Sequence, residues 1–91
     1  MLTLVWSDNA RKDVREAARY SADRNTPAAE RLSAAIEACA EQLLRHPFMY
    51  RPGRVPGTRE AVVHPNYILV YRVTAEAVEI LNLMHARQRY P

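Results

Sequence analysis

The chain has few of the residues that lock or anchor a small fold. It holds one cysteine among 91 residues, so no internal disulfide can form. Cys39 falls on an apolar helical stripe, which predicts a buried and unreactive thiol. No apolar run approaches the roughly 20 residues that a membrane-spanning helix needs. The opening MLTLVWSDNARKD has too short an apolar run for a signal peptide. We therefore expect a cytoplasmic protein without membrane contact.

Clustered metal ligands are missing as well. His46, His64 and His85 lie far apart in the sequence, and no Cys or carboxylate spacing accompanies them. The sequence therefore predicts no metal site and no cofactor. His64, which stands before Pro65, is expected to be a turn residue. Internal repeats and low-complexity segments are absent, so residues 1–91 are expected to form one small domain.

The formal net charge of +3 is carried by the second half of the chain. Residues 1–46 hold seven basic and seven acidic side chains, whereas residues 47–91 hold six arginines against three glutamates. The six arginines are Arg51, Arg54, Arg59, Arg72, Arg87 and Arg89. This excess suits an acidic or anionic partner, and it equally suits side chains that only keep a surface soluble.

A strand and two helices are predicted in the first half. Residues 2–6 are apolar with Thr3 and Val5 among them, which favours a strand. Ser7 or Asp8 can cap a helix that runs to about Arg24.

The second helix follows almost without a break. Asn25 suits a helix end with left-handed geometry. Thr26 is expected to cap the next helix, with Pro27 at its first position. One apolar stripe then faces the core: Ala29, Leu32, Ile36, Cys39, Ala40 and Leu43. His46 and Pro47 end the helix, and the short connection predicts an antiparallel helix hairpin.

Residues 47–57 contain three prolines and both glycines of the chain, which predicts a loop with little regular structure. We expect Phe48, Met49 and Tyr50 to anchor this loop to the core. Arg51 and Arg54 are expected to be exposed.

Three strands are predicted at 58–63, 67–74 and 77–84, joined by two-residue turns at 65–66 and 75–76. Turns this tight fix the register. Arg59 would face Arg72, and Arg72 would face Glu79, which gives a charged row across one face. The same register pairs Val63 with Ile68, Ala61 with Val70, and Val70 with Leu81.

Both faces of this sheet are expected to be apolar. One face would hold Val62, Leu69, Tyr71, Val73, Val78 and Ile80, and the other Ala61, Val63, Ile68, Val70, Leu81 and Leu83. Two helices on one side can cover only one face. The other face needs a loop, the carboxyl-terminal tail or another chain as its cover.

The whole chain resembles the RelE/ParE toxin superfamily. The resemblance lies in RPGRVPGTRE, VVHPNY, LVYRV, EIL and HARQ, and the TPAAERL, PGTRE and HARQ blocks are similar to the ParE branch. The resemblance implies an α+β fold: a strand, a helix hairpin, then a three-stranded antiparallel meander. It also implies a toxin of a type II toxin–antitoxin module, which forms a hetero-oligomer with an antitoxin encoded beside it.

Two kinds of target follow from the resemblance. RelE-like members cut mRNA on the ribosome, and three of their basic meander positions correspond here to Arg59, Ala61 and Ile68, of which only Arg59 is basic. ParE-like members inhibit DNA gyrase without known nuclease chemistry. The absence of basic side chains at positions 61 and 68 favours gyrase inhibition, with no catalytic residue expected. A toxin of another target, or a copy without activity, remains an alternative.

The candidate site residues belong to three sets. The expected target-binding set is Arg59, Arg72, Arg87, Arg89 and Tyr90. If the protein is an mRNA endonuclease instead, His85 and Tyr90 would be the acid/base pair, with Arg59 and Arg87 on the phosphate. The expected antitoxin-binding set is Val14, Ala18, Val63, Ile68, Val70, Leu81 and Leu83.

Overall fold

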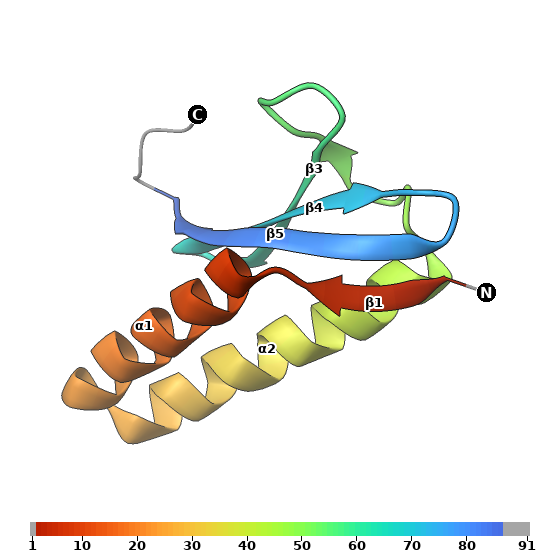
Figure 1. Cartoon of the computed structure of the whole chain (residues 1–91). Helices are drawn as coiled ribbons and strands as arrows, with labels where there is room; N and C mark the ends of the chain where they lie inside the picture. Colours follow the sequence, from red (N-terminus) through yellow and green to blue (C-terminus); the bar gives the residue numbers. More distant parts are fainter. Residues whose placement is uncertain (1, 87–91) are drawn as a thin grey trace.

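The computed structural model describes residues 2–86 and shows two helices packed on one face of a five-stranded sheet (Figure 1). The elements are β1 (Thr3–Trp6), α1 (Asp8–Arg24), α2 (Thr26–Arg45), β2 (Arg51–Pro52), β3 (Arg59–His64), β4 (Tyr67–Val73) and β5 (Ala77–His85). The strand order is β1-β5-β4-β3-β2. The expected α+β fold, with a strand, a helix hairpin and an antiparallel meander, is confirmed.

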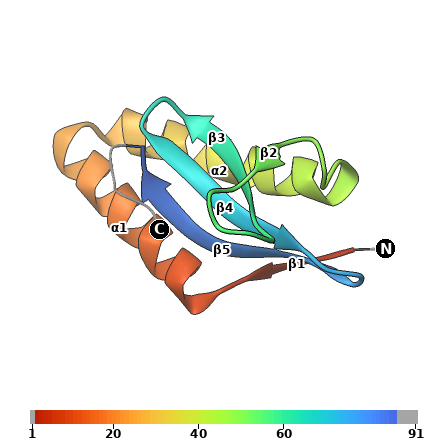
Figure 2. The ribbon, with the colours of Figure 1, turned by 90° about the horizontal axis from the view of Figure 1, so that it is seen from above.

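The amino-terminal strand joins the sheet beside the carboxyl-terminal one. β1 runs parallel to β5, with Thr3 opposite Ala77 and Trp6 opposite Ile80. A parallel pair needs a long crossover, and the helix hairpin supplies it. Both helices lie on the same side of the strands in Figure 1, and in the view from above α2 passes behind the strands while α1 lies beside the end of β5 (Figure 2).

The helix ends agree with the prediction, except that a different residue caps α2. Ser7 caps α1 because its side-chain oxygen accepts a hydrogen bond from the Ala10 amide at 3.0 Å. Asn25, not Thr26, caps α2, and its Oδ1 accepts from the Ala28 amide at 3.1 Å. The backbone of Asn25 is extended, with φ −166°, so the expected left-handed geometry is wrong. One extended residue ends α1 and begins α2.

Two β-bulges overturn part of the expected register. The turn at Pro65–Asn66 is present, with His64 opposite Tyr67, but Val63 is an extra residue and Val62 pairs with Ile68. Arg59 therefore faces Tyr71, and the expected pair with Arg72 is wrong.

The second hairpin keeps its register only near its turn. Arg72 faces Glu79 as predicted. Leu81 is then an extra residue, so Val70 pairs with Asn82 and not with Leu81. The predicted charged row across the sheet is reduced to its Arg72–Glu79 half.

The bulges also exchange residues between the two faces. The core under the helices contains Ala61, Leu69, Tyr71, Val78, Ile80 and Leu83, packed with Ala10, Ala17, Leu32, Ile36, Cys39 and Leu43. A second buried cluster consists of Ile68, Val70 and Met84. Ala61 and Leu83 were predicted on the face opposite Leu69 and Tyr71, so that assignment is wrong. Val62, predicted on the same face as Leu69 and Tyr71, is 58% exposed.

The segment after α2 is more ordered than expected, since it contains the short strand β2, paired with β3. Tyr50 packs against the core as predicted. Phe48 and Met49 do not, because they are 65% and 54% exposed. Within residues 2–86, no helix combines the length and apolar character that a bilayer crossing requires.

Candidate functional site

Arg59 is held by the segment that precedes the sheet. Its Nη1 donates to the carbonyl oxygen of Tyr50 at 2.7 Å and to that of Phe48 at 3.4 Å. Its guanidinium carbon lies 5.0 Å from the centre of the Phe48 ring, within cation–π range. Arg59, the first residue of β3, thus ties the segment that follows α2 to the sheet.

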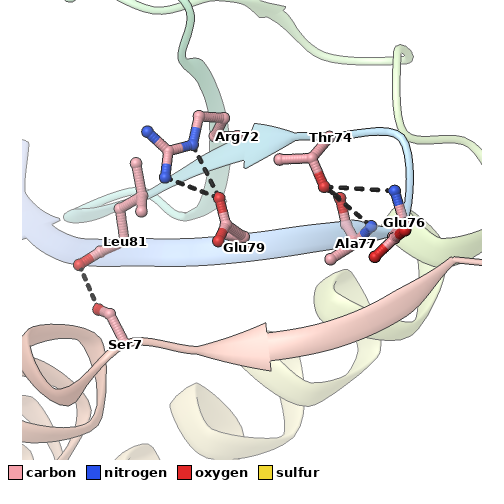
Figure 3. A network of polar contacts seen from close by, with 7 residues as sticks. All are labelled: Ser7, Arg72, Thr74, Glu76, Ala77, Glu79 and Leu81. Atoms are coloured by element: carbon pink, nitrogen blue, oxygen red, sulfur yellow. Dashed lines mark hydrogen bonds and ion pairs between the residues drawn. The ribbon is translucent and has the colours of Figure 1, made fainter.

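Arg72 is paired across the second hairpin. Its Nε donates to Oε1 of Glu79 at 2.8 Å, and its Nη2 lies 2.7 Å from the same oxygen (Figure 3). Both side chains are partly exposed, at 51% and 30%, so this pair contributes at most about 1 kcal/mol to stability. This pair neutralises an arginine of the expected target-binding set.

Glu60 holds the other two arginines and was not singled out by the sequence. Its side chain is 1% exposed. Oε1 accepts from Nη2 of Arg51 at 3.3 Å, and Oε2 accepts from the backbone amide of Arg54 at 3.0 Å. The Nε atom of Arg54 lies 3.7 Å from Oε2. Burying a carboxylate is costly unless such partners satisfy it, so Glu60 fixes the loop over β3.

We expect Glu60→Ala to lower the free energy of unfolding by about 2 kcal/mol, because it removes charge-assisted hydrogen bonds from a buried site. Glu79→Ala is the matched control, since it removes a carboxylate from a partly exposed pair and should cost less than about 1 kcal/mol. Urea denaturation of both variants measures the two losses. Equal losses would contradict the role given to Glu60.

An aromatic row crosses the end of the sheet where β3, β4 and β5 meet. The ring of Tyr67 lies 5.4 Å from the ring of His85, edge to face, and 5.9 Å from that of His64. His64 accepts a hydrogen bond at Nδ1 from the Asn66 amide at 3.1 Å, which confirms its turn role. Among residues 2–86, no group of three His, Cys, Asp or Glu side chains is arranged to hold a metal ion.

Tyr71, Tyr50 and Cys39 form a small polar cluster beside the core. Tyr71 donates its hydroxyl to the Pro47 carbonyl oxygen at 2.8 Å, and burial raises the pKa of Tyr71 to about 12 against the lowering effect of Arg59. Cys39 lies 3.8 Å from the hydroxyl oxygen of Tyr50. Burial raises the pKa of the Cys39 thiol, so it stays protonated and the prediction of a buried thiol is confirmed.

An apolar groove runs between the helices beside β1. It has a volume of about 440 Å³. Its lining residues are Trp6, Arg11, Val14, Arg15, Ser33, Ile36 and Glu37. Val14, from the expected antitoxin-binding set, lines this groove, and Ala18 lies half-buried one helical turn farther along α1. Trp6, at the end of β1, packs on the core and also forms one wall of the groove.

The rest of that set does not form one bare face. Ile68 and Val70 are buried in the second cluster, and Leu83 is buried under the helices. Val63 and Leu81, the two bulge residues, are half-buried. Of the other candidate residues, Arg87, Arg89 and Tyr90 lie outside the described residues.

Comparison with known proteins agrees with this architecture. Residues 4–90 match the family described as ParE toxin of type II toxin–antitoxin system, parDE. The protein Y4kP of Sinorhizobium fredii is 37% identical over 87 residues, and the match covers 94% of this chain and 90% of that protein.

Solved structures share the fold. A chain from the chromosomal ParDE system of P. aeruginosa has a TM-score of 0.82 at 21% identity, with 93% of this chain and 96% of that chain covered. The YoeB/ParE toxin from Agrobacterium tumefaciens has a TM-score of 0.71 at 18% identity, covering 98% and 100%. A chain of the E. coli DinJ–YafQ complex has a TM-score of 0.62 at 20% identity, covering 93% of each. With a family match along nearly the whole sequence and the same fold in these relatives, the chain belongs to the ParE toxin family of type II toxin–antitoxin systems.

Proposed function

We propose that this toxin inhibits DNA gyrase in the cytoplasm and has no nuclease activity. The observation that carries the proposal is that the arginines in the sheet, and Arg54 between β2 and β3, already contact groups within the chain. Arg51 and Arg54 contact Glu60, Arg72 contacts Glu79, and Arg59 donates to two backbone carbonyls. A cation that stabilises a phosphate in a transition state must be aimed at that phosphate. These four arginines already have partners inside the chain.

The positions that correspond to the other RelE-like cations support the same proposal. Ala61 is fully buried, and Ile68 is 4% exposed. Neither side chain carries charge, and neither is open to a bound RNA. Cleavage of RNA would thus depend on Arg59, which would have to give up its bonds to Tyr50 and Phe48.

One observation favours the alternative, a RelE-like endonuclease that cuts mRNA on the ribosome. His85 lies against Tyr67 in the row that also contains His64. Histidine is the side chain that serves most often as a general acid or base.

His85→Ala separates the two proposals. We expect this variant to keep most of its toxicity, because His85 packs at the end of β5 and carries no chemistry in a gyrase inhibitor. Removal of a general acid or base lowers a rate by about 100-fold or more. Growth arrest after induction, with circular dichroism as the check on folding, measures the effect. A folded variant that loses toxicity by two orders of magnitude would favour the endonuclease.

Induction of the wild-type toxin in cells tests the target directly. The expected result is relaxed plasmid DNA, from loss of supercoiling, together with an unchanged primer-extension map of cellular mRNA. Ribosome-phased cuts in mRNA with normal plasmid supercoiling would contradict gyrase inhibition.

We also propose that the cognate antitoxin covers the groove between α1 and α2 with an apolar helix. Trp6, Val14 and Ile36 supply the apolar surface for that helix. β1 is an edge strand of the sheet, so an extended antitoxin segment could add beside it. The complex is thus a hetero-oligomer of toxin and antitoxin.

A further inference from the structure

The loop between α2 and β2 ends in two exposed apolar side chains, Phe48 and Met49, which we call the tip. They are 65% and 54% exposed. They are consecutive, and a hollow of about 360 Å³ lies against them, lined also by His46 and Pro47. Large apolar side chains that stand together on a surface mark interaction sites more often than single ones do.

The tip points outward because the residues on both sides of it are fixed inward. The Pro47 carbonyl oxygen accepts from the Tyr71 hydroxyl at 2.8 Å. Tyr50 packs edge to face on Tyr71, with ring centres 6.4 Å apart. The Met49 amide donates to the His46 carbonyl oxygen at 3.1 Å. Only the two residues between these anchors are left to project.

Arg59 makes the tip rigid as well as exposed. It binds the carbonyl oxygens of Phe48 and Tyr50 and lies over the Phe48 ring. A tip that is already ordered loses little conformational freedom when a partner binds, so more of its contact energy appears as affinity. Exposed aromatic side chains held in this way are typical anchors of protein interfaces.

The surroundings of the tip are basic. Arg45, at the end of α2, and Arg51, in β2, are exposed. Glu60 is the acidic partner of Arg51, but its side chain is only 1% exposed. A partner therefore meets an apolar pair bordered by positive charge, which suits a recess rimmed with carboxylates.

We propose that the tip is the contact through which this toxin binds its protein target, and that the target presents an apolar recess with an acidic rim. The inference rests on the proposed function, in which the target is DNA gyrase. A protein fits better than a nucleic acid because the tip is apolar, and Arg59, which lies against it, already donates to two backbone carbonyls. The tip is also separate from the groove: His46, the C-cap of α2, lies ten positions after Ile36, or about 15 Å along the helix axis.

The test compares Phe48→Ser/Met49→Ser with Tyr20→Ser. Tyr20 is the matched control, since it is 54% exposed and has Arg24 stacked on its ring at 3.9 Å. Three quantities are measured for the wild type and both variants: inhibition of supercoiling by purified gyrase, growth arrest, and antitoxin binding. The tip variant should inhibit supercoiling about 100-fold less than the wild type, as expected for removal of an interface anchor. The control should change by less than about twofold, and both variants should bind antitoxin as tightly as the wild type does.

Four results decide the proposal. If the wild type and a folded tip variant inhibit gyrase equally, the tip is not the target contact, and the proposed function stands. A toxic wild type that does not inhibit gyrase, with a tip variant that is not toxic, overturns the gyrase target and supports the tip. A wild type that neither inhibits gyrase nor arrests growth overturns both. A tip variant that only loses self-association, seen by sedimentation, assigns the tip to a contact between copies and overturns the proposal.

Discussion

Val14→Asp is expected to release the toxin from its antitoxin while leaving the toxin folded. Val14 is half-buried and lines the groove with Trp6 and Ile36. An antitoxin helix seated there would bury the new carboxylate away from water, which is costly for an unpaired charge. Arg11 and Arg15, which also line the groove, offset part of this cost. We therefore expect antitoxin affinity to fall by about 100-fold, or about 3 kcal/mol.

Val62→Asp is the matched control for this experiment. Val62 is 58% exposed on β3, outside the groove, so the same change there should alter antitoxin affinity by less than about twofold. Calorimetric titration measures both affinities, and co-expression tests whether the antitoxin still rescues growth. Unchanged affinity in a folded Val14→Asp protein would remove the groove from the antitoxin interface.

Reversing two charges in the tail is expected to abolish growth arrest. Arg87 and Arg89 lie outside the described residues. They are two of the six arginines in residues 47–91, and the other four contact internal partners. Arg87→Glu/Arg89→Glu would place negative charge against an acidic target, and like charges across an interface cost several kcal/mol. Antitoxin binding should weaken far less.

Arg19→Glu/Arg31→Glu gives the same change in net charge on the exposed helices and is the control. Dilution plating after induction measures toxicity, and circular dichroism confirms that both variants fold. The control should remain toxic. Toxicity retained after the tail reversal would show that Arg87 and Arg89 do not contact the target.

The hydrophobic pattern predicted the layers because its signals are local. The stripe from Ala29 to Leu43 recurs at helical spacing, and every residue predicted on it is buried. Ser7 stands directly before a helix and can satisfy its free amides, so its role as cap followed from its position. The two-residue turns were equally local, and pairs close to them, His64 with Tyr67 and Arg72 with Glu79, follow the prediction.

The sheet register failed where the cause was not local. A bulge adds one residue to one strand. Val63 and Leu81 are the added residues here, and neither valine nor leucine is a residue type that indicates a bulge. Each bulge moves the residues beyond it to the opposite face, because side chains alternate along a strand. Ala61 and Leu83 therefore reached the helix-side core, and Arg59 lost its predicted place beside Arg72.

The loop contacts were also beyond reach of a single sequence. Phe48 and Met49 look like core anchors by residue type. The hydroxyl of Tyr71 and the ring of Tyr50 fix the loop on either side of them and leave them outside. A glutamate in a strand, such as Glu60, is usually a surface charge. Its pairing with Arg51 and Arg54 depends on the short strand β2, in a segment whose three prolines predicted a loop with little regular structure.

Inhibition of purified gyrase is the measurement that tests the proposed function most directly. The toxin is titrated into a supercoiling reaction containing only gyrase, ATP and relaxed plasmid, with its antitoxin added to half of the samples. We expect supercoiling to stop as the toxin concentration rises and to return when antitoxin is present in excess. Full supercoiling at toxin concentrations well above that of gyrase, with a preparation that still binds its antitoxin, would contradict gyrase as the target.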